Sequence, residues 1–264
     1  MANISKEEIA KQKEERLKTV VKNNQGCCMH IIKYDDTRNV YVEFTDKYKY
    51  IVHTNYKSFK NGSVRNPYYN SYYEVACIGN TKTVDSNGKI KKSYASWQQM
   101  IRRCYDKKAS NHKYYGGNEV YVCDEWLCYE NFEIWFNKNY YLCKDDVMVI
   151  DKDMLFPYNK CYCPSKCCIL PQRINTLILK ERGCRGKYLI GVSYIDRLGK
   201  FTAQGNFSSS TNHYIGIYDT EIEAFFAYKE AKERYIKDVV LNYKLYIPSE
   251  LYDALYKYEI KITD

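Results

Sequence analysis

Val147-Met-Val-Ile-Asp151-Lys-Asp153 opens the stretch that decides the fold, and Pro171-Gln-Arg-Ile-Asn175 closes it. An apolar run leads into an Asp-x-Asp turn, a proline-punctuated loop follows, and a short helix ends the stretch. A strand, a loop and a helix in this order can gather carboxylate and amide oxygens around one hard divalent cation. The candidate oxygens belong to Asp151, Asp153, Asn159 and Asn175.

This pattern resembles the ββα-metal (HNH) core of phage and intron-encoded endonucleases, in the subgroup whose motif runs Leu-Asp-(Arg/Lys)-x-Asp, Asn, Tyr-x-Pro-x-x-Cys and Gln-x-x-Asn. The resemblance implies that Asp151 is a metal ligand or its positioner and that Asp153 is a second carboxylate. It also implies that Asn159 fixes the loop and that Asn175 is a ligand on the helix. The cation would be Mg²⁺ or Mn²⁺, which prefer oxygen ligands. An Asx-type turn that merely holds a loop explains the same residues without a metal.

The sequence departs from the family at the end of the first strand, where the family has a histidine that activates water. Asp151-Lys152-Asp153 fills that place, and no histidine lies between His112 and His213. Lysine is a poor general base unless it is strongly desolvated. If the protein cuts, the base would be a water shell, Asp153 or a histidine such as His112.

Three functional hypotheses follow. The first is a homing-type endonuclease that uses a divalent cation to hydrolyse phosphodiester bonds in double-stranded DNA. The second is a catalytically inactive DNA-binding protein on the same scaffold, acting as a regulator or an anti-defence factor. The third is a protein that binds a protein partner through its N-terminal module. The sequence leaves the oligomeric state open.

The four cysteines at Cys161, Cys163, Cys167 and Cys168 raise a structural zinc site as an alternative. Their spacing lacks the usual paired Cys-x₂-Cys knuckles, and the family motif needs only Cys167, so we expect packing roles and not zinc.

The composition favours a cytoplasmic protein with a polyanionic partner. The formal net charge of the 264 residues is +9, which is a mild bias toward nucleic acid. The chain opens with a charged segment and has no apolar run near 18 residues, so we expect no membrane partner. Its 12 cysteines then indicate reduced thiols in the cytoplasm, which would be that of a bacterial host if the gene is phage-borne.

Hydrophobic periodicity predicts an α+β protein with several modules. A helix at residues 1–26 precedes alternating strands that predict a small antiparallel meander or SH3-like barrel at 27–92. At 93–107 a helix is expected whose buried face carries Trp97, Met100, Ile101, Cys104 and Tyr105. That helix, Tyr-x-Gly-Gly and Val-Cys-x-Glu-Trp resemble the segment that precedes the core in many phage HNH proteins. The predicted modules are 1–26, 27–92, the HNH-like core at 93–180, a basic linker at 181–187, a small DNA-binding domain at 188–240, and a helical extension at 241–264.

The last module rests on a second resemblance. Gly191-Val-Ser-Tyr194, Gly199-Lys-Phe and Asp219-Thr220-Glu-x-Glu-Ala224 are similar to the APETALA-type (ethylene-response-factor) DNA-binding domain. That family packs three antiparallel strands on one helix and lays the sheet in the major groove. The resemblance, with the basic run before it, implies double-stranded DNA as the partner. The expected contacts are Arg173, Arg182, Arg185, Lys187, Tyr194, Arg197, Lys200, Gln204 and Asn206.

Overall fold

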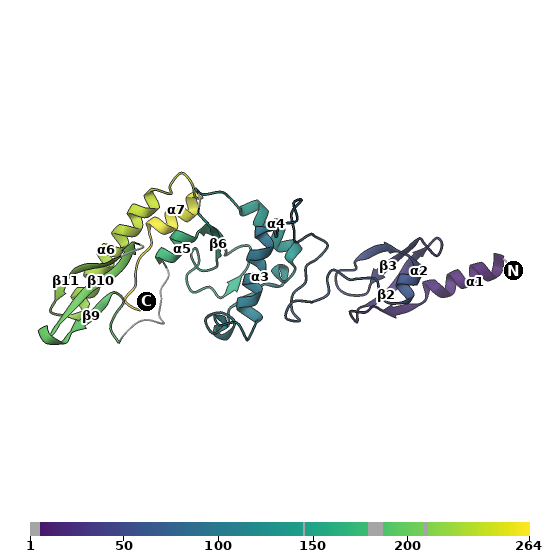
Figure 1. The fold of residues 1–264 in the computed structure, drawn as a ribbon, viewed down its shortest axis with the longest axis horizontal. Helices are drawn as coiled ribbons and strands as arrows, with labels where there is room; N and C mark the ends of the chain where they lie inside the picture. The colour runs from purple at the N-terminus through teal and green to yellow at the C-terminus, as the bar shows by residue number, and fades with distance from the viewer. Residues whose placement is uncertain (1–5, 145, 179–186, 209–210) are drawn as a thin grey trace. The chain divides into compact units, whose positions relative to one another are not determined.

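The computed structural model describes residues 6–144, 146–178, 187–208 and 211–264. The chain forms two compact units, Met1–Phe136 and Asn137–Asp264. This division falls inside the segment 93–180 that the sequence assigns to one core. Each unit contains helices together with antiparallel strands, which confirms the α+β class (Figure 1). No helix within the described ranges is both long and apolar enough to cross a membrane.

The first unit begins with a helix and a four-stranded antiparallel sheet in the order β1-β2-β3-β4. Residues that alternate along these strands, among them Met29, Ile31 and Val42, form a buried core with Phe59. Val20–Lys22 is a strand, although the sequence analysis placed it in the first helix; the helix ends at Leu17, and these residues pair with β2. The elements are α1 Lys6–Leu17, β1 Val20–Lys22, β2 Cys28–Tyr34, β3 Val40–Phe44, β4 Ile51–Thr54 and α2 Tyr56–Lys60.

The rest of the first unit is a helical segment built around large aromatic side chains. The predicted buried face of α3 is confirmed for Trp97, Met100, Ile101 and Cys104, whereas Tyr105 is only partly buried. Trp97 donates its indole N–H to the Trp126 carbonyl at 2.7 Å, which joins α3 to the segment before α4. The elements are α3 Lys92–Tyr105, η1 His112–Tyr114, η2 Gly116–Asn118, β5 Tyr121–Val122, η3 Asp124–Leu127 and α4 Tyr129–Asn139.

The second unit contains the strand, loop and helix that the sequence predicts around Asp151. Strands β6 and β8 form an antiparallel hairpin in which Met148 pairs with Pro171 and Asp151 with Cys168. The hairpin and α5 share one buried core with the end of α6 and with α7, and Leu170 and Ile174 belong to this core. The elements are β6 Met148–Asp151, β7 Cys161–Tyr162, β8 Cys168–Pro171 and α5 Gln172–Ile178.

A three-stranded antiparallel sheet in the order β11-β10-β9 completes this unit, and α6 packs along it (Figure 1). Thr220 caps α6 in a reciprocal capping box with Glu223. The helix continues to Leu241, and Leu251 of α7 packs with the hairpin core. The elements are β9 Val192–Ile195, η4 Asp196–Leu198, β10 Lys200–Ser208, β11 Thr211–Tyr218, α6 Glu221–Leu241 and α7 Ser249–Tyr256.

Candidate functional site

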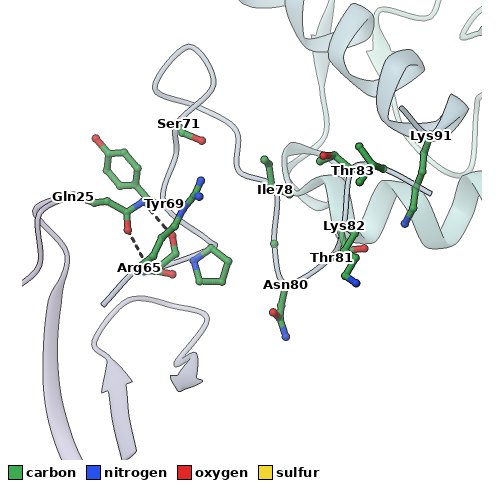
Figure 2. A pocket seen from close by; sticks show the side chains of 14 residues that line it. Gln25, Arg65, Tyr69, Ser71, Ile78, Asn80, Thr81, Lys82, Thr83 and Lys91 are labelled. Atoms are coloured by element: carbon green, nitrogen blue, oxygen red, sulfur yellow. Dashed lines mark hydrogen bonds between the residues drawn. The ribbon is translucent and has the colours of Figure 1, made fainter. Parts of the chain in front are cut away.

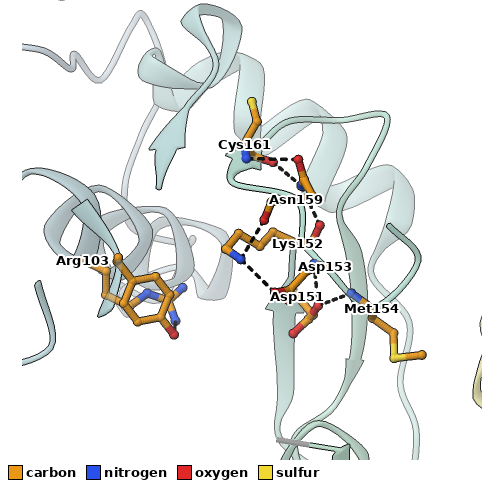
Figure 3. A network of polar contacts seen from close by, with 8 residues as sticks. Arg103, Asp151, Lys152, Asp153, Met154, Asn159 and Cys161 are labelled. Carbon is orange, nitrogen blue, oxygen red and sulfur yellow. Dashed lines mark hydrogen bonds and ion pairs between the residues drawn. The ribbon is translucent and has the colours of Figure 1, made fainter. Parts of the chain in front are cut away.

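The turn after β6 is an Asx turn organised by Asp151. Its Oδ1 accepts the backbone N–H of Asp153 at 2.9 Å and that of Met154 at 2.6 Å (Figure 3). The Lys152 ammonium donates to Asp153 Oδ2 at 3.0 Å and to the Asn159 carbonyl at 2.9 Å. An ammonium that donates to a carboxylate and a carbonyl is not placed to remove a proton from water. Lys152 therefore closes the turn and does not replace the missing histidine.

Asn159 fixes the loop, which is the role that the family resemblance implies. Its amide nitrogen donates to the carbonyls of Lys152 and Cys161, both at 2.7 Å, and its Oδ1 accepts the Cys161 N–H at 3.1 Å (Figure 3). These three hydrogen bonds engage both ends of the amide. Asn159 therefore positions the loop.

The electrostatics of the turn disfavour a charged Asp151. Burial, together with the neighbouring Asp153 carboxylate, raises the pKa of Asp151 to about 6, although two backbone N–H groups oppose the shift. The folded protein therefore binds a proton at Asp151 at pH values where the unfolded chain has released it. Ionisation of Asp151 lowers the free energy of unfolding as the pH rises from about 4 to about 6.

Asp151→Asn is expected to make the protein more stable at pH 7.5, by on the order of 1–2 kcal/mol. The amide keeps an oxygen for both backbone donors and removes the buried charge. The difference between variant and wild type should vanish near pH 4, where the wild-type carboxyl is protonated in the folded state. Urea denaturation between pH 4 and pH 8 measures this difference. A difference that does not change with pH would contradict the assigned pKa.

Asn175 carries the second feature that is relevant to a cation. Its Oδ1 is buried and accepts no hydrogen bond from any residue that the structure describes. An unsatisfied buried acceptor is costly, and a bound cation or water would satisfy it. This oxygen and the Asp151 carboxylate are each donors of the hard type that Mg²⁺ or Mn²⁺ prefers. Asp153 fits less well because its carboxylate already pairs with Lys152.

The cysteines of the loop differ in burial, since Cys167 is buried and Cys161, Cys163 and Cys168 are partly exposed. Within the described residues, no group of three or more His, Cys, Asp or Glu side chains could hold a metal ion. Burial raises the pKa of Cys167, and it raises the pKa of Cys168 to about 12. Cys167 is buried, as expected for a packing residue of the motif.

The second candidate surface is the face of the three-stranded sheet that lies opposite α6. Along β10, Phe201, Ala203 and Phe207 pack toward α6, so Lys200, Thr202 and Gln204 alternate to the opposite face. We call this the outer face. Gln204 donates to the Ser193 hydroxyl at 3.3 Å, and Thr202 donates to the Gly216 carbonyl at 3.1 Å.

The expected DNA contacts fall into different environments. Arg197 is exposed in the turn between β9 and β10, and Lys200 is exposed beside Asp219 at 2.9 Å. Arg173 is exposed on α5, and Lys187 is exposed with its ammonium over the Tyr188 ring.

Three further expected DNA contacts lie partly or wholly outside the described residues. Asn206 lies in β10 opposite Asn212, and its side chain is outside the described part of the structure. Arg182 and Arg185 also lie outside the described residues.

Tyr194, which is among the expected DNA contacts, does not lie on the outer face. Tyr194 pairs with Phe201 across the strands, and Val192 pairs with Ala203, so Tyr194 shares the face that packs toward α6. Its ring contacts the Phe201 ring, with centroids 4.9 Å apart. The outer face instead presents Tyr214, which pairs with Gln204 and is 60% exposed. In the sequence, only the alternation of side chains along β11 points to Tyr214. That alternation does not show which of the two faces of the strand packs against α6.

Comparison of the chain with protein-family models, with curated proteins and with solved structures finds no match.

Proposed function

We propose that the chain binds double-stranded DNA through the outer face of its three-stranded sheet. The observation that carries the proposal is the division of β10, whose apolar side chains pack toward α6 while Lys200 and Gln204 lie on the other face. That face also carries the apolar Ile217 of β11, which pairs with Thr202. Arg197 and Lys200 suit phosphates, and the Gln204 amide suits the edge of an adenine. A β-ribbon fits the width of the major groove. The net charge of +9 adds a sequence-independent attraction to the duplex.

Arg197→Ala/Lys200→Ala is expected to weaken binding to every duplex and to flatten its salt dependence. Each lost phosphate contact reduces the slope of log K against log salt by about 0.9, so the double variant should lose about 1.8. Gln204→Ala should leave that slope unchanged and relax the preference among sequences. Fluorescence anisotropy measures both quantities over a range of about 50 to 300 mM salt, which includes the physiological concentration.

Lys237→Ala/Lys244→Ala is the matched control for this experiment. Both lysines are exposed in the same unit, and Lys237 lies on α6, on the other side of the sheet. The control should keep the wild-type slope to within one phosphate contact. Equal losses in the two double variants would mean that the net charge alone, and not the outer face, accounts for binding.

A second candidate function, metal-dependent hydrolysis of DNA, is favoured by the unpartnered Asn175 oxygen near the end of the hairpin motif. Asp151 and Asn175 would hold Mg²⁺ or Mn²⁺, which would supply Lewis-acid stabilisation of charge on the scissile phosphate. The arrangement of Lys152 counts against this function, because its ammonium donates to Asp153 and to the Asn159 carbonyl and is not placed as a general base. Mn²⁺ should raise the melting temperature of the wild type and not that of Asn175→Ala if this cation site exists.

A further inference from the structure

The first unit contains a polar groove that no motif of the sequence explains. It has a volume of about 750 Å³ and is lined mainly by the loop at residues 65–84, with Gln25 and Lys91 at its ends. Figure 2 shows Arg65 and Tyr69 on one wall and Asn80, Thr81 and Lys82 on the other. The groove lies within Met1–Phe136, whereas the sheet described above lies within Asn137–Asp264.

The wall that carries Arg65 is held by a reciprocal pair of hydrogen bonds. The Asn66 N–H donates to Gln25 Oε1 at 2.7 Å, and Gln25 Nε2 donates back to the Asn66 carbonyl at 3.3 Å (Figure 2). Asn23 supports this pair by donating to Gln25 Oε1 at 3.1 Å and to the Val64 carbonyl at 2.9 Å. These side chains hold the backbone around Arg65 in place before any ligand arrives.

The floor of the groove is fixed by Gly79. Its φ of +80° is a conformation that favours glycine, and a Cβ there would lie 2.7 Å from Glu130 Cβ and 3.0 Å from Cys128 Sγ. The Gly79 N–H donates to the Pro67 carbonyl at 3.1 Å, which joins the two walls. The chain therefore passes close to α4 at this point.

The two carboxylates next to the groove accept hydrogen bonds from its lining residues, and that of Glu133 is also paired with a cation. Glu130 Oε2 accepts from the Tyr68 hydroxyl at 2.7 Å and from the Asn80 N–H at 3.2 Å. Glu133 binds the Lys91 ammonium at 2.8 Å and the Thr81 hydroxyl at 2.7 Å. No aspartate or glutamate is among the described residues that line the groove. The charged side chains that line the groove are therefore cationic.

Arg65 and Lys82 supply that charge. Both residues are exposed, and neither forms an ion pair with another described residue. Two cations without acidic partners on facing walls are suited to bind phosphate groups. The hydroxyls and amides between them are further hydrogen-bonding groups for a phosphodiester backbone.

Tyr69 adds a flat apolar surface at the rim. The adjacent Tyr68 packs its ring against Tyr48, with centroids 4.3 Å apart, and bonds to Glu130, whereas Tyr69 remains 41% exposed. An exposed aromatic ring beside phosphate-binding cations is the arrangement with which proteins stack the unpaired bases of a single strand. A duplex would offer no free base face to such a ring.

We propose that this groove binds a single nucleic-acid strand, with Arg65 and Lys82 on its phosphates and one base stacked on Tyr69. The inference does not depend on duplex binding by the outer face, because the two surfaces belong to different units. The ligand of the first unit would then be a strand whose bases are unpaired.

The test uses the full chain and a fluorescent thymidine oligonucleotide of about 12 nucleotides. Arg65→Ala/Lys82→Ala should bind it roughly 10- to 30-fold more weakly near 0.1 M salt, with a salt slope reduced by about 1.4. Lys57→Ala/Lys89→Ala is the matched control, because both lysines are exposed in the same unit and neither lines the groove. Tyr69→Ala should lose about 5-fold or more, and Tyr69→Phe should bind as the wild type does.

Two further measurements distinguish the strand from other anions and from the duplex site. An abasic oligonucleotide of equal length should bind as weakly to the wild type as the thymidine strand binds to Tyr69→Ala. A strand carrying 5-iododeoxyuridine should crosslink to Tyr69 in the unaltered protein. Arg197→Ala/Lys200→Ala should leave strand binding intact, so failure of duplex binding and failure of this proposal give different results. Wild-type affinity in Arg65→Ala/Lys82→Ala, or equal binding of the abasic and thymidine strands, would overturn the proposal.

Discussion

Gly116→Ala is expected to lower the free energy of unfolding of the first unit by about 3 kcal/mol or more. A Cβ at this position would lie 1.9 Å from the Cys104 carbonyl oxygen and 2.6 Å from His112 Nε2. The carbonyl belongs to the backbone of α3 and cannot move without disturbing the helix that carries Trp97. Overpacking that displaces side chains alone already costs about 1–3 kcal/mol, so a backbone clash should exceed that range.

Gly117→Ala is the matched control, because its Cβ would meet nothing closer than the His112 carbonyl at 3.2 Å. All three tryptophans of the chain, Trp97, Trp126 and Trp135, lie in the first unit, so tryptophan fluorescence in urea reports on this unit alone. The control should lose about 1 kcal/mol or less. Equal losses at the two glycines would mean that η2 does not pack on the end of α3.

Gly191→Ala is expected to have an effect of similar size on the second unit. Gly191 has a φ of +75°, and a Cβ there would lie 2.1 Å from Tyr228 Cδ2. The Tyr228 ring is buried between the sheet and α6. The cost combines an unfavourable backbone conformation with displacement of the ring, and we expect about 3 kcal/mol or more. The sheet should then open, and duplex binding should fall with it.

Gly199→Ala separates these two contributions. Gly199 also has a positive φ, of +63°, but its Cβ would meet only the Tyr194 hydroxyl, at 3.8 Å. The loss should therefore be limited to the backbone term of about 1 kcal/mol. Hydrogen exchange of the β10 and β11 amides, followed by mass spectrometry, measures both variants. Protection in Gly191→Ala that equals that in Gly199→Ala would contradict the packing of Tyr228 against β9.

The sequence predicts the elements of this fold better than their partners. The strands within residues 27–92 and the apolar face of α3 each depend on residues within a few positions of one another. Both are found in the structure, with Tyr105 the one member of that face that is only partly buried. Val20–Lys22 was missed because a strand of three residues has little pattern of its own and depends on pairing with β2. The face of Tyr194 was assigned wrongly because the pattern of a strand does not show which side the helix covers.

The same limit applies to the candidate sites. The turn at Asp151 and the bonds of Asn159 span at most seven residues, so a local motif can indicate them. The groove in the first unit depends on the Gln25–Asn66 pair, which is separated by 41 residues, and on Glu130, which is farther along the chain. Polar loop residues carry no periodicity that would reveal such partners.

We propose that the chain binds duplex DNA and does not cut it, because the Lys152 ammonium at the hairpin turn is held by Asp153 and the Asn159 carbonyl. The most direct measurement incubates supercoiled plasmid with the full chain in Mg²⁺ or Mn²⁺ and follows gel retardation and nicking in the same samples. The account predicts retardation that weakens with salt and is reduced in Arg197→Ala/Lys200→Ala, with the plasmid still supercoiled after removal of the protein. Nicking that EDTA stops and that is lost in both Asp151→Ala and Asn175→Ala would contradict it.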